Sequence, residues 1–264
     1  MKKPRRRNKS SPRPSVPWSP DGLILALQFW KGDQGKAFAL ARLLADIEPI
    51  RRNDVTLYLC CDSSSEQGDE LVSTLRYCEG KMPVGTFQSM RAGTGYPGGP
   101  NALWSDTMEH FYQEWASGRL RFESVFTFEA DGAPLRRDWI TELIKAHKET
   151  LAQRLLITAS IRHHHYIRHP NGNLIAHVSI VRNYPELATT PQSKPWDMHH
   201  HVTLCRLARH DPVIASEHQS RNWTGESLTS ISKETAWLHG AQDRSAFNFA
   251  KKLIPRKRAR GNGK

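Results

Sequence analysis

Short apolar runs and helically spaced apolar positions alternate between residues 23 and 161 of the chain. Uninterrupted apolar runs of this length are typical of strands buried on both faces. They predict strands over residues 23–29, 55–61, 124–128 and 155–161. Apolar residues spaced for one face of a helix predict helices over residues 35–47, 69–78, 101–117 and 138–149. The alternation predicts an α/β fold with a single Rossmann-like, mostly parallel sheet and helices on both faces.

The pattern is less regular after residue 162. It predicts a strand over residues 177–182, a short helix or loop over 225–234 and a final helix over 245–253. Residues 93–100 (GTGYPGGP) are predicted to form a loop, because glycine permits backbone conformations that other residues resist. Asp138 is placed to cap the helix that follows it. We expect the C-terminal half to complete the sheet and to form the acceptor side.

The net charge of +12 is concentrated at the two ends of the chain. Residues 1–13 and 251–264 are rich in Lys and Arg and contain no acidic residue, so the residues between them are close to neutral. Residues 1–20, rich in Arg, Lys, Ser and Pro, are expected to be disordered. We therefore predict a basic disordered tail over 1–20, one domain over 21–250 and a basic C-terminal tail over 251–264. Such tails favour tethering to DNA, RNA or an anionic membrane, or serve only solubility.

Two further features bear on the location of the protein. No apolar run approaches the roughly 20 residues of a membrane-spanning helix, and no apolar segment follows the basic N-terminus as in a secretory signal. The four cysteines, Cys60, Cys61, Cys78 and Cys205, have no CxxC spacing and indicate neither a zinc site nor a disulfide framework. We expect a cytoplasmic protein with reduced cysteines.

Two carboxylates follow the strand predicted over residues 124–128. Glu129 and Asp131 are separated by one residue, and ligands bind beyond the carboxyl ends of strands in open α/β sheets. Carboxylate oxygens suit Mg²⁺ or Mn²⁺, which in turn bridge the oxygens of a diphosphate. The pair therefore predicts a metal site, with a solvated turn as the alternative.

The sequence around this pair resembles a known family. FEADGAPLRRDWI, residues 128–140, resembles the Asp-x-Asp region of GT-A type glycosyltransferases, with Glu129 in place of the first Asp. The likeness is strongest to bacterial and phage enzymes similar to glycosyltransferase family 2. GYPGGPNALW (95–104) and LHGAQDRSA (238–246) resemble the Gly-rich loop and the C-terminal segment of that group. An Asn171-Gly172-Asn173 turn and the pair Trp196-Asp197 occur in the expected order.

The resemblance implies a GT-A fold and a nucleoside-diphosphate sugar as donor, with a UDP-sugar as the first candidate. It implies that Glu129, Asp131 and His239 hold Mn²⁺ or Mg²⁺, with a buried structural histidine as the alternative at His239. The donor contacts that we predict are Gln28, Trp30, Asp62, Gly95, Gly99, Asn101, Asp131 and Asp243. Gln242 departs from the family, where Lys is usual, and so does not supply a positive charge to the diphosphate.

Asp197 is the predicted catalytic base, because an inverting enzyme needs a carboxylate that takes the proton of the acceptor hydroxyl. In a retaining enzyme the same residue would only position the acceptor. The histidine runs 163–165 and 199–201 are interpreted as phosphate or acceptor contacts rather than as a zinc site. Gly35-Lys36 is not part of a phosphate-binding P-loop, since Trp30 and Ala37 occupy the positions that need Gly and Ser or Thr.

These observations predict a metal-dependent glycosyltransferase. The basic tails and the likeness to phage enzymes favour a hydroxymethylpyrimidine in DNA as the acceptor, which would place a phage-encoded protein in the host cytoplasm. A glycosyltransferase acting on cell-surface carbohydrate or protein, and a non-catalytic nucleic-acid-binding protein, are the alternatives. The sequence predicts no oligomeric state.

Overall fold

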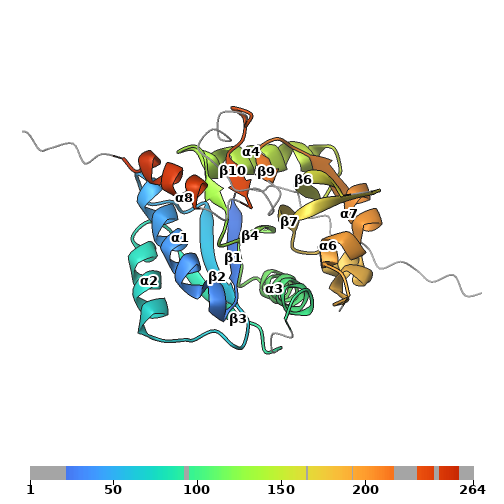
Figure 1. Cartoon of the computed structure of the whole chain (residues 1–264), viewed down its shortest axis with the longest axis horizontal. Coiled ribbons are helices and arrows are strands. Elements are labelled where there is room, and N and C mark those ends of the chain that lie inside the picture. Colours follow the sequence, from blue (N-terminus) through green and yellow to red (C-terminus); the bar gives the residue numbers. More distant parts are fainter. Residues whose placement is uncertain are drawn as a thin grey trace, which may run out of the picture.

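A seven-stranded sheet forms the centre of the molecule (Figure 1). The computed structural model describes residues 22–91, 95–164, 166–191, 193–216, 231–240 and 244–255. The strands of the main sheet are β1 (Leu23–Phe29), β2 (Val55–Cys61), β3 (Val84–Gln88), β4 (Ser124–Glu129), β6 (Ile157–His164), β7 (Ile167–His177) and β8 (Ala208–His210). Their order is β3-β2-β1-β4-β7-β6-β8. The predicted tail over residues 1–20 lies outside the described residues.

The sheet is mostly parallel, as the sequence predicted. β3, β2, β1 and β4 run parallel to one another, and β8 runs parallel to β6. β7 is antiparallel to both of its neighbours. The four predicted strands of the first half are confirmed as β1, β2, β4 and β6, because each of these runs is apolar enough to be buried on both faces.

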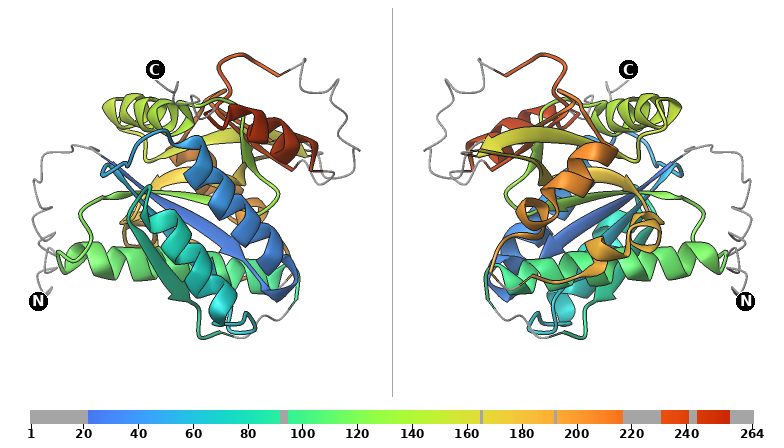
Figure 2. Two further views of the ribbon diagram at one scale, coloured as in Figure 1. Left: turned by 90° about the vertical axis from the view of Figure 1, so that its left-hand side faces the viewer. Right: turned by 90° about the vertical axis from the view of Figure 1, so that its right-hand side faces the viewer.

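Helices cover both faces of the main sheet (Figures 1 and 2). One face packs against α1 (Gln34–Ile47), α2 (Asp69–Glu79), α4 (Trp139–Ala152) and α8 (Ser245–Ala250). The other packs against α3 (Gly98–Ala116), α5 (Ile180–Asn183), α6 (Trp196–His199) and α7 (His201–Leu207). Alternate residues of β1 belong to the two cores, with Leu25 in the first and Ala26 in the second.

A second, three-stranded sheet stands beside the end of β4. It consists of β5 (Ala133–Pro134), β10 (Trp237–His239) and β9 (Ile214–Ser216), in that order. Trp237 is fully buried and packs edge-on against Phe126 and Phe128 of β4. A Cβ atom at Gly132 would lie 2.5 Å from the Trp237 ring, so this position admits only glycine without displacement. The packing fixes β10 against the turn that follows β4.

β7 contains a β-bulge in its pairing with β6. Between the pairs Ile161–Pro170 and Ala159–Leu174, β7 advances four residues while β6 advances two. The extra residues belong to Asn171-Gly172-Asn173, which the sequence analysis interpreted as a turn; the structure places them inside β7. Thr127 Oγ1 donates to Gly172 O (3.0 Å) and Trp237 Nε1 donates to Asn173 Oδ1 (3.1 Å). The bulge therefore connects β7 with both β4 and β10.

The secondary-structure predictions were wrong at three places. No strand covers residues 177–182, because β7 ends at His177 and Ile180–Asn183 is helical; a short apolar run does not distinguish the two. α3 begins at Gly98 rather than at Asn101, because Pro100 falls in the first turn, where the missing N–H is not needed. Asp138 precedes α4 but does not cap it, since its carboxylate pairs with Arg136.

One strand was missed, the final helix was found, and the C-terminal end of the fold differs from the predicted one. β3 was not predicted, whereas the final helix is confirmed as α8 and a 3-10 turn over Lys251–Leu253. Leu253 and Ile254 pack against the first core, so residues 251–255 belong to the folded part rather than to a tail. Most of the segment 225–234 lies outside the described residues. All four cysteines are free thiols, and no helix in the described ranges has the length and apolar character needed to cross a bilayer.

A buried polar network joins α4 to the main sheet. Thr158 Oγ1 donates to Thr150 Oγ1 (2.8 Å), so at the 2.9 Å contact with His147 Nδ1 the ring nitrogen is the donor. His147 Nε2 then accepts from Ser124 Oγ (3.1 Å). Burial, with a smaller contribution from the neighbouring His177, lowers the pKa of His147 to about 3. The ring is therefore neutral in the folded protein across the physiological range.

This network predicts a loss of stability in acid that depends on His147. Between the unfolded pKa of about 6.5 and the folded value, only the unfolded chain takes up a proton, so the free energy of unfolding falls as the pH falls. The contribution between pH 7 and pH 4.5 is roughly 2 to 3 kcal/mol. The measurement is urea unfolding of the wild type and of His147→Gln across this range.

The difference between the two proteins isolates the histidine, because carboxylate contributions are common to both. We expect the wild type to lose more stability than His147→Gln as the pH falls. The exposed His163, replaced by Gln, serves as the control for the loss of one histidine. Parallel pH curves for wild type and His147→Gln would contradict the assignment.

Candidate metal and donor site

The carboxyl ends of the central parallel strands meet at one edge of the main sheet. Gln28 of β1 lies beside Cys60 of β2 and beside Glu129 of β4. A turn closed by a hydrogen bond from Gly132 N to Glu129 O (3.1 Å) then carries the chain into β5. Ligands bind at this edge in open α/β sheets. Glu129 and Asp131, the predicted metal-binding carboxylates, both belong to this turn.

His239 reaches the same turn from the far end of the chain. β10 pairs with β5 through Leu238 and Ala133, which brings its last residue over the two carboxylates. His239 Nε2 lies 3.1 Å from Glu129 Oε2 and 3.2 Å from Asp131 Oδ1. One ligand atom from each of the three side chains lies within 4.8 Å of the others. Within the described ranges, no other group of three His, Cys, Asp or Glu side chains is arranged to hold a metal ion.

The second ring nitrogen of His239 is held by Ser216. His239 Nδ1 lies 3.1 Å from Ser216 Oγ, and the same oxygen accepts from Arg162 Nη1 at 3.4 Å. A histidine whose Nδ1–H is hydrogen-bonded to a neighbour presents the lone pair of Nε2, which is the form that binds metals. Ser216 therefore orients the ring toward the two carboxylates.

The cluster carries a strongly negative field. Asp131 Oδ1 is buried and has no well-directed hydrogen bond among the described residues. Burial lowers the pKa of His239, but the charges of Asp131 and Glu129 outweigh burial and raise it to about 10. Burial raises the pKa of Asp131, and the adjacent His239 outweighs this and holds it below its usual value. Two carboxylates and an imidazole whose ligand atoms meet within 4.8 Å fit a divalent cation in a mixed N/O shell.

A cleft of about 780 Å³ opens beside the cluster. The predicted residues that line it are Gln28, Trp30, Asp62, Gly95, Gly99, Glu129 and Asp131. Trp30 is 58% exposed, and its Nε1 donates to Asp33 Oδ2 at 2.7 Å, which fixes the indole at the mouth of the cleft. Asp62 Oδ1 accepts from Ser64 Oγ at 2.7 Å.

Two cations also line the cleft. Lys36 Nζ donates to Asp33 Oδ1 (2.8 Å), and Arg244 follows the segment that carries His239. Arg244 belongs to the C-terminal segment LHGAQDRSA (238–246), whose resemblance implies a place near the diphosphate or the acceptor. Lys36 was considered only as part of a P-loop and was missed as a cleft residue. Its place in the first turn of α1, directly behind the end of β1, was the signal that could have indicated it.

One predicted donor contact does not line the cleft, and another lies outside the described residues. Asn101 is buried, and its Nδ2 donates to Pro191 O (2.6 Å) and Lys194 O (2.9 Å). Its Oδ1 accepts from Trp196 N (2.8 Å), so the amide holds the segment before α6 rather than facing a ligand. Asp243 lies outside the described residues.

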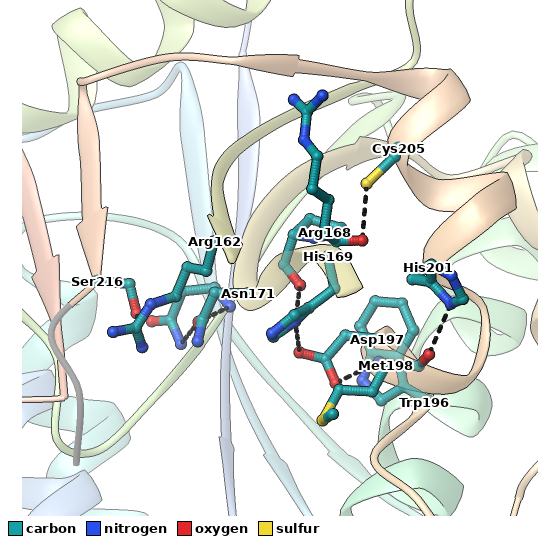
Figure 3. Close-up of polar contacts among 12 residues, drawn as sticks. Arg162, Arg168, His169, Asn171, Trp196, Asp197, Met198, His201, Cys205 and Ser216 are labelled. Carbon is teal, nitrogen blue, oxygen red and sulfur yellow. Dashed lines mark hydrogen bonds and ion pairs between the residues drawn. The ribbon is translucent and has the colours of Figure 1, made fainter. Parts of the chain in front are cut away.

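Asp197, the predicted base, lies beside His169 (Figure 3). The preceding residue, Trp196, lines the cleft and stacks on Trp104 of α3 with ring centroids 3.8 Å apart. The Asp197 carboxylate contacts His169 Nδ1 at 3.2 Å. His169 was not singled out from the sequence, since a lone histidine in an irregular stretch carries no spacing signal.

The histidines of the two runs whose side chains the structure describes do not line the cleft. His200 Nε2 contacts Thr189 Oγ1 (3.1 Å), and His201 Nδ1 contacts Met198 O (3.0 Å). His163 is exposed near the end of β6. None of these described histidines lines the cleft, so the structure does not place them at the phosphate or acceptor contacts that we expected. His165 lies outside the described residues.

Comparison with known proteins identifies the fold. No protein-family model matches the chain, and no curated protein matches its sequence. The galactosyltransferase LgtC, solved with donor and acceptor sugar analogues, is 10% identical over 89% of this chain and 98% of its own, with a TM-score of 0.51. The glycosyltransferase GlyE of Streptococcus pneumoniae is 9% identical over 89% of this chain and 60% of its own (TM-score 0.53). Mouse xyloside xylosyltransferase 1 is 10% identical over 84% of this chain and 98% of its own (TM-score 0.51).

These similarities confirm the GT-A type fold that the sequence resemblance implied. At this level of identity they establish the architecture alone. The cluster of Glu129, Asp131 and His239 is seen in this chain itself, and it indicates a metal site independently of these similarities.

The cluster predicts that Mn²⁺ binds here. It also predicts that the loss of Mn²⁺ affinity differs between substitutions of the ligands and of the residue that orients them. Asp131→Asn and His239→Ala each remove a ligand and should lower Mn²⁺ affinity by about 100-fold or more. Ser216→Ala leaves the ligands in place but frees the imidazole ring, and should lower affinity about 10- to 100-fold. Isothermal titration of the nucleotide-free protein with Mn²⁺ measures these affinities.

Asp62→Asn is the matched control, since it neutralises a cleft carboxylate outside the cluster and should leave Mn²⁺ affinity unchanged. Equal affinities for wild type, Asp131→Asn and His239→Ala would show that the cluster does not bind the ion.

Proposed function

We propose that this protein is a glycosyltransferase that transfers a sugar from a nucleoside-diphosphate sugar to an acceptor hydroxyl with the help of a divalent cation. The observation that carries the proposal is the convergence of Glu129, Asp131 and His239 in a cleft at the carboxyl edge of a GT-A type sheet. Neither a nucleic-acid-binding protein nor a structural protein requires two carboxylates and a buried histidine to meet there.

The cluster supports Mn²⁺ or Mg²⁺ as the cofactor. Carboxylate oxygens suit both ions, and the imidazole favours Mn²⁺. When bound, such an ion neutralises the charge on the diphosphate as it leaves the sugar. Lys36 and Arg244 line the same cleft and supply positive charge on the protein side.

The part of the cleft that is lined by Trp30 and Asp62 is suited to the nucleoside. Trp30 offers an exposed indole face, held by Asp33, on which a base can stack. Asp62 is held by Ser64 and offers a carboxylate to the ribose hydroxyls or the base. We take UDP as the first nucleotide to test.

We propose a hydroxymethylpyrimidine in DNA as the acceptor. The support is the charge of the chain, since the segments 1–13 and 251–264 are basic and free of acidic residues, and such segments bind phosphates without reading sequence. Leu253 and Ile254 pack against the first core, so a truncation of the C-terminal basic segment is placed after residue 255. LgtC was solved with an acceptor sugar analogue, and a carbohydrate acceptor is therefore the alternative.

Metal-dependent nucleotide binding tests the donor site. We expect UDP to raise the melting temperature only when Mn²⁺ or Mg²⁺ is present, by the few degrees that correspond to about 2.7 kcal/mol at 100 times the Kd. A UDP-sugar should be hydrolysed slowly with the ion and not after chelation with EDTA. Arg244→Gln should weaken UDP binding, and Lys252→Gln, an exposed cation outside the cleft, should not. DNA binding without any metal-dependent nucleotide binding would favour the non-catalytic alternative.

Mass analysis of DNA tests the acceptor. Hydroxymethylated DNA incubated with the protein, Mn²⁺ and a panel of sugar nucleotides should gain the mass of one sugar per modified base, and unmodified DNA should not. Removal of residues 1–13 and 256–264 should weaken DNA binding. The slope of the logarithm of the binding constant against the logarithm of the salt concentration should become less negative by roughly 0.9 per lost phosphate contact. Sugar transfer to an oligosaccharide but not to DNA would replace the DNA proposal with the carbohydrate alternative.

A further inference from the structure

We propose that His169 Nε2 takes the proton of the acceptor hydroxyl and that Asp197, the predicted base, acts by orienting His169. The inference deepens the glycosyltransferase function proposed above and rests on it. It starts from a pair of side chains on different elements, His169 on β7 and Asp197 on α6 (Figure 3).

The carboxylate of Asp197 is already engaged on both oxygens. Oδ1 accepts from Met198 N at 2.9 Å, and Oδ2 lies 3.2 Å from His169 Nδ1. The side chains of His169 and Asp197 are both largely buried, at 11% and 12% exposed. What separates them is that both oxygens of the Asp197 carboxylate already accept a hydrogen bond, one of them from the imidazole.

The contacts of His169 determine which ring nitrogen carries its proton. Nδ1 lies 3.2 Å from Asp197 Oδ2 and 3.2 Å from Pro170 O, and both partners accept hydrogen bonds only. Nδ1 must therefore be the donor, and in the neutral ring the lone pair lies on Nε2. Among the residues drawn in Figure 3, the hydrogen bonds of this ring are made by Nδ1 and none by Nε2. This is the arrangement in which a carboxylate orients a histidine base.

Residues next to the pair in the chain line the donor cleft. Gly172, three residues after His169 and part of the β7 bulge, lines the cleft, as does Trp196 next to Asp197. Tyr96 also lines it, and burial together with the charges of Asp197 and Glu129 raises the pKa of its hydroxyl.

The local structure fixes the pair in place. Asn101 accepts from Trp196 N, and the Trp196 ring stacks on Trp104, so the start of α6 is held against α3. His169 is held by its place in β7, where it pairs with Arg162 of β6. The hydrogen bond from His169 to Asp197 raises the pKa of the imidazole despite its burial, which makes it a stronger base.

The proposed step is a direct displacement. The acceptor oxygen forms a bond to the anomeric carbon of the donor sugar while its proton passes to His169 Nε2. The bond from the anomeric carbon to the diphosphate oxygen breaks, and its electron pair leaves with the nucleoside diphosphate. The imidazolium then returns the proton to water. Because attack and departure take place on opposite sides of the carbon, the product has the inverted anomeric configuration.

Kinetics of matched variants test the role of His169. With the UDP-sugar that the wild type turns over, His169→Ala should lower kcat by about 10²- to 10⁴-fold. Its KM for the donor and its affinity for Mn²⁺ with UDP should stay within about twofold of the wild type. Added imidazole should restore part of kcat in His169→Ala, a response that a merely structural role would not give. Asp197→Asn should lower kcat without rescue by imidazole, and His201→Ala, on the neighbouring helix, should behave like the wild type.

Two results would overturn the assignment. If His169→Ala keeps kcat within threefold while Asp197→Asn loses it, Asp197 itself takes the proton. If the sugar is transferred with its anomeric configuration retained, as shown by proton NMR of the product, no base of this kind acts.

A measurement on the resting protein keeps the inference separate from the proposed function. Nitrogen-15 NMR of labelled histidine, recorded where the ring is neutral and assigned with His169→Gln, should show a proton on Nδ1 and none on Nε2. A proton on Nε2 in the neutral ring would overturn the dyad, whatever the donor. Absence of turnover with every sugar nucleotide, together with the expected tautomer, would contradict the proposed function and leave the dyad supported.

Discussion

The site depends on the electrostatic free energy that it costs to bring two carboxylates together in a partly buried turn. Glu129 and Asp131 lie in one tight turn, and like charges at such a distance disfavour their joint ionisation unless a positive group lies between them. In the protein alone this group is His239, whose pKa rises to about 10 because both carboxylates face it. The same field makes the site suitable for a divalent cation, and so the electrostatic constraint and the proposed chemistry have one origin.

Contacts of the C-terminal half hold His239 against that turn. β10 pairs with both β5 and β9, Trp237 is buried against β4, and Gly132 leaves room for its ring. Trp237 also donates to Asn173, which ties the β7 bulge to the same strand. His169 lies just before this bulge in β7, so the strand that carries the proposed base is tied to the strand that carries His239.

The sequence predicted the first half of the fold well, since strands such as Leu23–Phe29 are buried on both faces and their apolar runs are uninterrupted. β3 was missed because Val84–Gln88 is only partly buried and lacks such a run. The acidic pair was found from its place after a strand, whereas His239, 110 residues further along the chain, was indicated only by a family resemblance. Asn101 and His169 show why the rest could not be predicted: their roles depend on contacts with residues distant in the sequence, which no local pattern encodes.

The most direct test of the account is a crystal structure of the protein with Mn²⁺ and UDP, in which the anomalous signal of manganese locates the ion. The account predicts one peak within coordination distance of Glu129, Asp131 and His239, with the diphosphate of UDP bound to it in the cleft. A peak elsewhere, or UDP bound in the cleft with no ion between its phosphates and these side chains, would contradict it.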